Sequence, residues 1–187
     1  LHDSRDVIRL LPATQETLRT RILGLGSPLI FGAELGCFPA GAHCAEFARR
    51  VNVSVPASLV DCDYTCAKPP RYAFLNSGFV AGRAGAIARF YDRVLRESVD
   101  HHTRHGKWPL DQAVVTRNFL ATPGATLDYE GVLSLQLHRM RRRSFVLYRG
   151  VALSLLTRAS PLYLHCKGGS KWMWKPLSLH ASTESTG

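Results

Sequence analysis

The spacing of apolar residues along the chain predicts an alternation of helices and strands. Apolar residues recur at helical spacing in 14–23, 42–51, 84–97 and 111–120, and the segment 84–97 is the most strongly amphipathic of these. A continuous apolar run at 29–33 is too short for a helix and is typical of a strand buried on both faces. Together, these segments predict an α/β domain.

Further short strands are expected between and after these helices. Strands that alternate with helices favour a parallel arrangement, so we expect a mostly parallel sheet flanked by helices. The segment 53–70, rich in Pro, Ser, Cys and Asp, is interpreted as a long loop, and the polar tail 178–187 as a frayed end. The expected strands lie at 74–81 (interrupted by Asn76-Ser77-Gly78), 125–128, 132–137, 144–148 and 161–165.

The composition is that of one folded domain with a basic surface. The chain has 187 residues, of which 45% are apolar, and its net charge is +10. This charge favours an anionic partner, which could be nucleic acid, an acidic membrane or a phosphate-bearing substrate. No membrane span is expected in this segment, because its longest apolar stretch, Phe145 to Leu156, is short and broken by Arg149.

The cysteines give no metal-binding signature. They are few and odd in number, and their spacing is not that of a zinc ribbon, so we interpret them as buried or free thiols: Cys37, Cys44, Cys62, Cys66 and Cys166. The triplet Asn52-Val53-Ser54 is a glycosylation acceptor if the chain enters the secretory pathway. The first residue is Leu1 rather than Met, and we therefore expect the chain to be a fragment.

Two aspartates near the start of the chain suit a hard metal ion. Asp3 and Asp6 stand just before the apolar pair Val7-Ile8, where a strand meets a turn. Two carboxylates at this spacing can converge on Mg²⁺ or Mn²⁺, which prefer oxygen ligands. The simpler interpretation of the same residues is a solvated acidic turn.

Two further motifs place polar groups where strands and helices meet. Asn76 and Ser77 interrupt an apolar strand and can offer amide and hydroxyl groups to a ligand, while Gly78 permits close approach of the backbone. The alternative is an Asx turn. Asp111, with Gln112 after it, stands at the start of a predicted helix and is either a helix cap or a catalytic carboxylate.

The last motif follows the strand 161–165. His165 offers an imidazole that can bind a metal ion, and the glycines and lysines after it, through Lys171, suit a diphosphate. A lone histidine at a strand end is also common as a structural residue.

Taken in order, these motifs resemble the glycosyltransferase domain of procollagen lysyl hydroxylases and the related collagen glycosyltransferases. The resemblance covers about residues 3 to 171. Its most specific part is Phe74 to Gly78 followed by Asp111-Gln112. The motifs that carry it are Asp3-Ser4-Arg5-Asp6-Val7-Ile8, Phe31-Gly32-Ala33-Glu34, Cys37-Phe38-Pro39, Phe74-Leu75-Asn76-Ser77-Gly78, Asp111-Gln112, Leu127-Asp128 and His165-x-x-Gly168.

The resemblance implies a nucleotide-sugar-binding α/β domain of the GT-A type over 1–177. It implies Mn²⁺ or Mg²⁺ as cofactor, a UDP-sugar donor and a protein or glycan hydroxyl as acceptor, hydroxylysine or its glycosylated form among them. It also implies a glycoprotein of the endoplasmic reticulum or Golgi lumen. The implied roles are metal binding by Asp3, Asp6 and His165; catalysis by Asp111; donor binding by Arg5, Asn76, Lys167, Gly168 and Lys171; and sugar or acceptor binding by Glu34, Phe38 and Gln112.

The sequence also departs from the family pattern. Arg5 stands where the family has an aromatic residue between its aspartates, Phe38 where it has Trp, and Cys166-Lys167 where it has Gly-Asn. In the family, a nucleotide-binding strand precedes the aspartates, so we expect the domain to lack its first strand or strands here.

Two other functions remain open. A degenerate transferase domain that binds a sugar or a partner without turnover would explain the departures from the pattern. A nucleic-acid-binding module would use the basic run His138-Arg139-Met140-Arg141-Arg142-Arg143. No nucleic-acid motif accompanies that run, so we expect no nucleic-acid partner.

Overall fold

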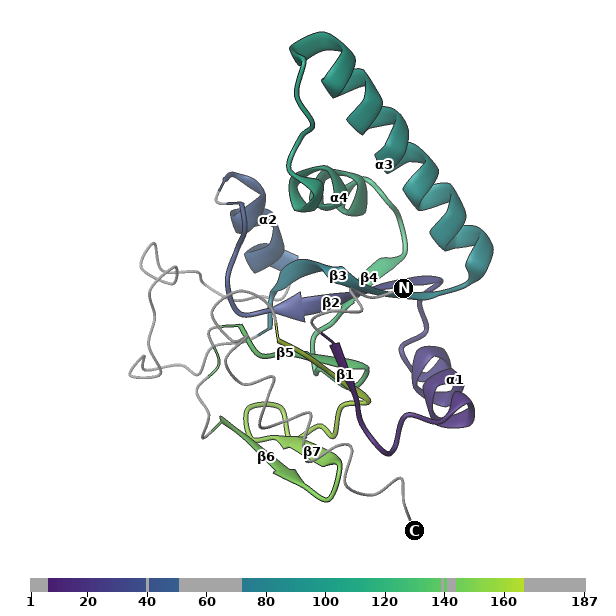
Figure 1. Cartoon of the computed structure of the whole chain (residues 1–187), viewed down its shortest axis with the longest axis vertical. Coiled ribbons are helices and arrows are strands. Elements are labelled where there is room, and N and C mark those ends of the chain that lie inside the picture. Colours follow the sequence, from purple (N-terminus) through teal and green to yellow (C-terminus); the bar gives the residue numbers. More distant parts are fainter. Residues whose placement is uncertain (1–6, 40, 51–71, 139, 141–143, 167–187) are drawn as a thin grey trace.

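The computed structural model describes residues 7–39, 41–50, 72–138, 140 and 144–166 (Figure 1). The predicted loop at 53–70 and the tail at 178–187 lie outside these residues. In chain order the elements are β1 (Val7–Arg9), α1 (Gln15–Gly24), β2 (Leu29–Glu34), α2 (His43–Arg50), β3 (Phe74–Gly82), α3 (Ala84–His105), α4 (Asp111–Leu120), β4 (Ala125–Asp128), β5 (Ser134–Gln136), β6 (Phe145–Tyr148), β7 (Val151–Ser154) and β8 (Tyr163–His165).

The fold is α/β, built on a mixed sheet. Six strands form it, in the order β1-β8-β5-β2-β3, with β4 paired to β2. The strands β2, β4, β5 and β8 run parallel to one another, whereas β1 is antiparallel to β8 and β3 to β2. The expected parallel arrangement therefore describes the inner strands, and the two antiparallel strands stand at the edges.

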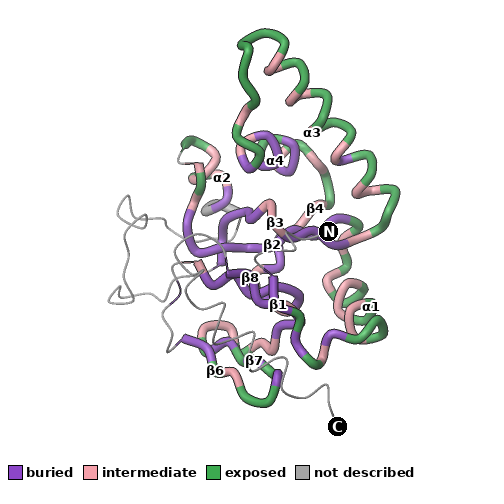
Figure 2. Tube along the Cα trace, viewed as in Figure 1, coloured by how far each residue is buried: buried purple, intermediate pink, exposed green. Residues whose placement is uncertain are grey.

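Helices cover both faces of the sheet. Figure 1 shows α2, α3 and α4 on one side and α1 on the other. A cluster of aromatic rings fills the first interface: the ring of Phe31 in β2 lies 5.0 Å from that of Phe90 in α3 and 5.7 Å from that of Phe119 in α4. Phe47 of α2 stacks on Phe119 at 5.7 Å. These buried rings hold three helices to β2 and its neighbours (Figure 2).

The opposite face is apolar only over part of its length. There, Leu18 and Ile22 of α1 pack near the buried residues Ile30, Phe79 and Ala81. The apolar cover ends before the carboxyl ends of the parallel strands, where buried polar side chains take its place.

The predicted helices are confirmed, with one correction. The first helix begins after Thr14, whose hydroxyl accepts from the backbone N–H of Thr17, as its N-cap position requires. The helix expected at 84–97 continues to His105. The i,i+4 ion pair of Asp100 with Arg104 lies in the extra turns and supports them, and Gly106 ends the helix in the left-handed conformation.

The strand β7 was not among the strands that the sequence predicted. The apolar stretch after 144 forms a hairpin of β6 and β7, with Arg149 and Gly150 at positive φ between them. The apolar pattern predicted β6 but not β7, because the turn Arg149-Gly150 between them has Arg at a position where Asn, Asp or Gly is the usual signal.

The strand β3 contains the irregularity that its sequence predicted. Phe31 pairs with Val80, whereas the next residue of β2, Gly32, pairs with Asn76. The residues Ser77 to Phe79 are therefore extra to the ladder and form a bulge beside β2. Such bulges re-aim side chains, and this one carries the Asn-Ser-Gly motif.

Asp128 fixes the turn after β4. Its carboxylate is buried and accepts hydrogen bonds from the backbone N–H groups of Val132, Leu133 and Ser134 at 2.9, 2.7 and 2.9 Å. Burial raises the pKa of this carboxyl above the ordinary 3.8, and the N–H donors act in the opposite direction. The carboxylate thereby sets the start of β5.

We predict that Asp128→Ala lowers the free energy of unfolding by about 2 kcal/mol or more, because buried N–H groups lose their acceptor. The exposed residue Asp100 serves as control, and Asp100→Ala should change the free energy of unfolding by less than about 0.5 kcal/mol.

A raised pKa in the folded state means that the stability contributed by Asp128 falls as the pH rises above 3.8. Urea unfolding should therefore show a larger loss in Asp128→Ala at about pH 4 than at about pH 7. A loss equal to that of Asp100→Ala at both pH values would contradict this role.

Candidate functional site at the carboxyl ends of the strands

Three parallel strands end in buried polar side chains on one face of the sheet. Glu34 is the last residue of β2, Gln136 of β5 and His165 of β8, and each is about 1% exposed. Gln136 and His165 are register partners, and Ala33 pairs with Leu135, so the three side chains alternate onto the same face. The carboxyl ends of parallel strands are where α/β proteins most often bind ligands.

Glu34 is held by amide donors from two other segments. Its Oε1 accepts from Nε2 of Gln112 at 2.7 Å, and its Oε2 accepts from Nδ2 of Asn76 at 3.3 Å. The Oδ1 of Asn76 in turn accepts from the backbone N–H of Gly78 at 3.0 Å. The Asx-type hydrogen bond expected for Asn76 is therefore present, and the amide group of the same side chain donates to Glu34.

Gln112 joins four parts of the chain. Besides Glu34, its Nε2 group lies within hydrogen-bond distance of the carbonyl oxygens of Leu75, at 2.9 Å, and Phe38, at 3.1 Å. Its Oε1 accepts from the hydroxyl of Ser77 at 3.4 Å. Through these bonds, one buried amide ties the start of α4 to β2, β3 and the loop after β2.

Asp111 lies exposed at the first position of α4. The N-cap residue is Leu110, and Oδ1 of Asp111 accepts from the backbone N–H of Gln112 at 2.6 Å. Burial, and secondarily the negative charge of Asp111, raises the pKa of the Tyr91 phenol on α3. The carboxylate is thus within electrostatic reach of a phenol while it stays open to solvent.

His165 packs directly on the bulge of β3. A Cβ atom at position 78 would lie 2.4 Å from Cε1 and 3.1 Å from Nε2 of the imidazole, so only glycine fits there. At the other side of β8, the register partner of His165 is Val7, the first residue of β1. The bonded neighbour of Val7 in the chain is Asp6, a predicted metal ligand.

A disulfide closes the loop that displays Phe38. Cys37 and Cys44 are bonded, which corrects their interpretation as thiols, whereas Cys166 is a buried cysteine. Phe38 is 53% exposed. The potential ligand atoms of Cys37, Cys44 and His43 lie within 4.8 Å of one another, but the disulfide occupies both sulfur atoms. In this oxidised form, the group is a covalent clamp for the loop.

The structure brings together some of the predicted site residues. Glu34, Asn76 and Gln112 are in contact, and Gln112 also contacts the backbone of Phe38.

The sequence analysis did not name Gln136 as a site residue, although the polar-apolar-polar order of Ser134-Leu135-Gln136 indicates a strand with one polar face. The basic run at 138–143 is described only at 138 and 140. The predicted residues outside the described part of the chain are Asp3, Arg5, Asp6, Lys167, Gly168 and Lys171.

No model of a known protein family matches the chain, and no curated protein matches its sequence. None of the helices in the described part of the chain is long and apolar enough to cross a membrane.

We predict that Gly78→Ala destabilises the protein by about 1–3 kcal/mol, because the added methyl group would collide with the buried ring of His165. Gly24→Ala is the matched control. It lies in α1 with nothing within 4 Å of the added atom, so it should be neutral or stabilise by about 0.5–1 kcal/mol. Thermal unfolding of the two variants tests the packing, and equal melting temperatures would contradict it.

Proposed function

We propose that this protein is a metal-dependent glycosyltransferase of the GT-A type, which moves a hexose from a UDP-sugar to a hydroxyl group of a protein or glycan. The observation that carries the proposal is the contact among Glu34, Asn76 and Gln112. These residues come from three motifs far apart in the sequence, and all three motifs belong to the resemblance described above. Their convergence at the carboxyl ends of parallel strands supports a shared site.

The exposed Asp111 supports a catalytic role beside this network. The buried Gln112 fixes the first turn of α4 by its side chain, and this holds the neighbouring Asp111 in place while its carboxylate faces solvent. A carboxylate held in this way can orient an acceptor hydroxyl, or it can stabilise positive charge that develops on the transferred sugar.

Phe38 would form the sugar or acceptor side of the site. Its ring is exposed, while its carbonyl oxygen accepts a hydrogen bond from Gln112 and its loop is closed by the disulfide. An aromatic ring presented on a constrained loop can stack against the apolar face of a sugar with little loss of entropy. The network thus couples Phe38 to the segment that carries Asp111.

His165 fits a metal site in part. Its imidazole lies at a strand end, on the face that carries the polar network, and its register partner Val7 directly follows Asp6 in the chain. We propose that Asp3, Asp6 and His165 hold Mn²⁺ or Mg²⁺. A divalent ion bound there would neutralise negative charge on the departing UDP.

We propose that the protein acts in the secretory pathway. The disulfide between Cys37 and Cys44 is compatible with an oxidising compartment, and the acceptor triplet at Asn52 would be glycosylated there. The donor-binding roles of Arg5, Lys167, Gly168 and Lys171 remain part of this proposal.

We predict that Asp111→Asn lowers the rate of hexose transfer about a hundredfold or more in the full-length protein. The amide oxygen of Asn can still accept from the N–H of Gln112, so the melting temperature should stay within a few degrees of wild type. Asp100→Asn, on the exposed surface of α3, is the matched control and should transfer at the wild-type rate. Release of UDP from a panel of UDP-sugars measures the rate, and an unchanged rate in Asp111→Asn would leave Asp111 a structural residue.

Removal of divalent ions should abolish transfer. We expect full-length protein treated with a chelator to lose UDP release and to regain it when Mn²⁺ is added, since the charge on the leaving diphosphate then has its counter-ion. Undiminished release in the presence of the chelator would overturn the metal assignment while leaving the role of Asp111 open to its own test.

A further inference from the structure

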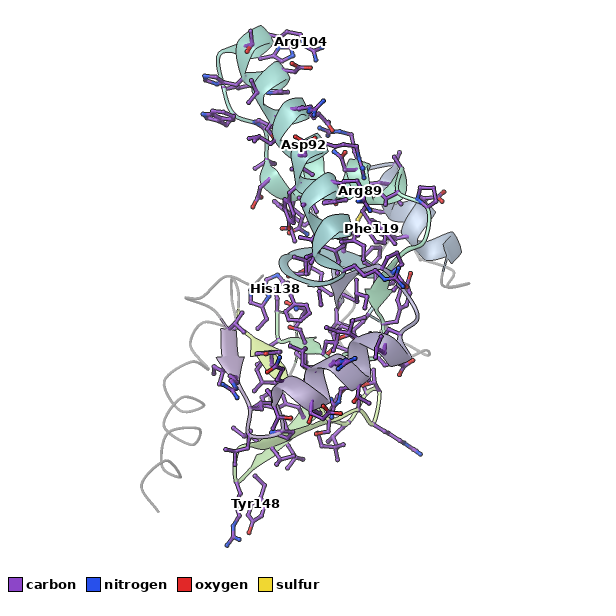
Figure 3. All side chains as sticks on the ribbon, turned by 90° about the vertical axis from the view of Figure 1, so that its right-hand side faces the viewer. Arg89, Asp92, Arg104, Phe119, His138 and Tyr148 are labelled. Carbon is purple, nitrogen blue, oxygen red and sulfur yellow. A yellow bond between two sulfur atoms is a disulfide. The ribbon has the colours of Figure 1, made fainter. Side chains whose placement is uncertain are left out.

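The hairpin of β6 and β7 presents an apolar face to solvent. Strand pairing sets Val146 opposite Leu153 and Tyr148 opposite Val151, and all four side chains point to the same side of the hairpin. They are between 41% and 66% exposed. Figure 3 shows Tyr148 at the end of the molecule opposite to Arg104, pointing away from the rest of the structure. We call these four residues the hairpin face.

The hairpin face is mounted on a firmly attached support. On the inner side, Phe145, Ala152 and Ser154 are buried. The backbone N–H of Leu11 donates to the carbonyl of Gly150 at 3.0 Å, and the side chain of Leu11 fills the space beside that glycine. The outer apolar side chains are therefore held in a fixed array rather than on a loose loop.

Arginines precede and follow β7 in the chain. The guanidinium of Arg149 lies 5.3 Å from the ring centroid of Tyr148, at the turn, and Arg158 follows β7 with an exposed side chain. The sequence has no aspartate or glutamate from Gly131 to Thr183. Apolar side chains beside cations are the combination that binds anionic lipid surfaces.

We propose that the hairpin face docks this protein on an anionic lipid surface. Val146, Tyr148 and Leu153 would enter the boundary between headgroups and acyl chains, and Arg149 would remain among the lipid phosphates. A tyrosine ring suits this boundary, because one end of it is apolar and the other polar. This attachment does not depend on the proposed transfer activity.

Two other occupants fit the face less well. A pair of four-residue strands spans only about 14 Å by 10 Å, far less than the roughly 800 Å² that each partner of a stable dimer buries. Nucleic acid would bind the arginines and could stack one base on Tyr148, but Val146, Val151 and Leu153 offer its bases neither hydrogen bonds nor rings for stacking. Lipid uses the cations and the apolar side chains together.

Vesicle co-sedimentation tests the proposal. The probes are phosphatidylcholine vesicles with and without phosphatidylserine, and the variant carries Val146→Ser, Tyr148→Ser and Leu153→Ser. We expect wild type to bind only the vesicles that contain phosphatidylserine, and the variant to bind them at least about tenfold more weakly. The control Leu23→Ser, Leu95→Ser and Val99→Ser removes as many exposed apolar groups elsewhere and should bind as wild type does.

Several results would overturn the proposal. These are absence of wild-type binding to anionic vesicles, equal binding by the hairpin variant, and equal loss of binding in the control variant. Binding to duplex RNA without binding to vesicles, or a dimer that only the hairpin variant loses, would also do so. If circular dichroism shows that the triple variant is unfolded, the single change Tyr148→Ser at the most exposed position makes the same comparison, with a weaker but measurable loss expected.

Discussion

The buried carboxylate of Glu34 is the constraint on which the polar end of the molecule depends. A carboxylate at the end of an inner strand is costly to remove from water unless donors replace the lost solvent. Gln112 and Asn76 supply such donors from α4 and β3. Removal of either would take a donor away from this buried carboxyl group, so the network favours one relative position of β2, β3 and the start of α4.

The same network determines what remains accessible. The buried side chain of Gln112 donates to Glu34 and to the carbonyl oxygens of Leu75 and Phe38, and so holds these segments together. Two groups on the segments that it holds, the carboxylate of Asp111 and the ring of Phe38, stay exposed. A rigid interior with two exposed groups of different chemistry is the arrangement expected of a site that positions a polar ligand with an apolar side.

The molecule also separates buried polar side chains from exposed apolar ones. Polar side chains are buried at the carboxyl ends of β2, β5 and β8, whereas the β6–β7 hairpin turns apolar side chains outward. The reason is the layering: the central sheet is covered by helices on both faces, while a two-stranded hairpin buries only one of its faces. Attachment through the hairpin would leave the strand ends free for a ligand.

Periodicity predicted much of the local structure of this protein. The spacing of apolar residues located the four helices of the described residues and the buried β2, and the Asn-Ser-Gly motif indicated an interruption of β3, because these features arise from neighbouring residues. Contacts between distant segments decided the rest: the antiparallel edges, the disulfide of Cys37 with Cys44, and the fit of His165 against Gly78. A linear pattern states which side chains are apolar, but it does not state which strand lies beside which. Only packing in three dimensions decides that Gln112 meets Glu34, since 78 residues of chain separate them.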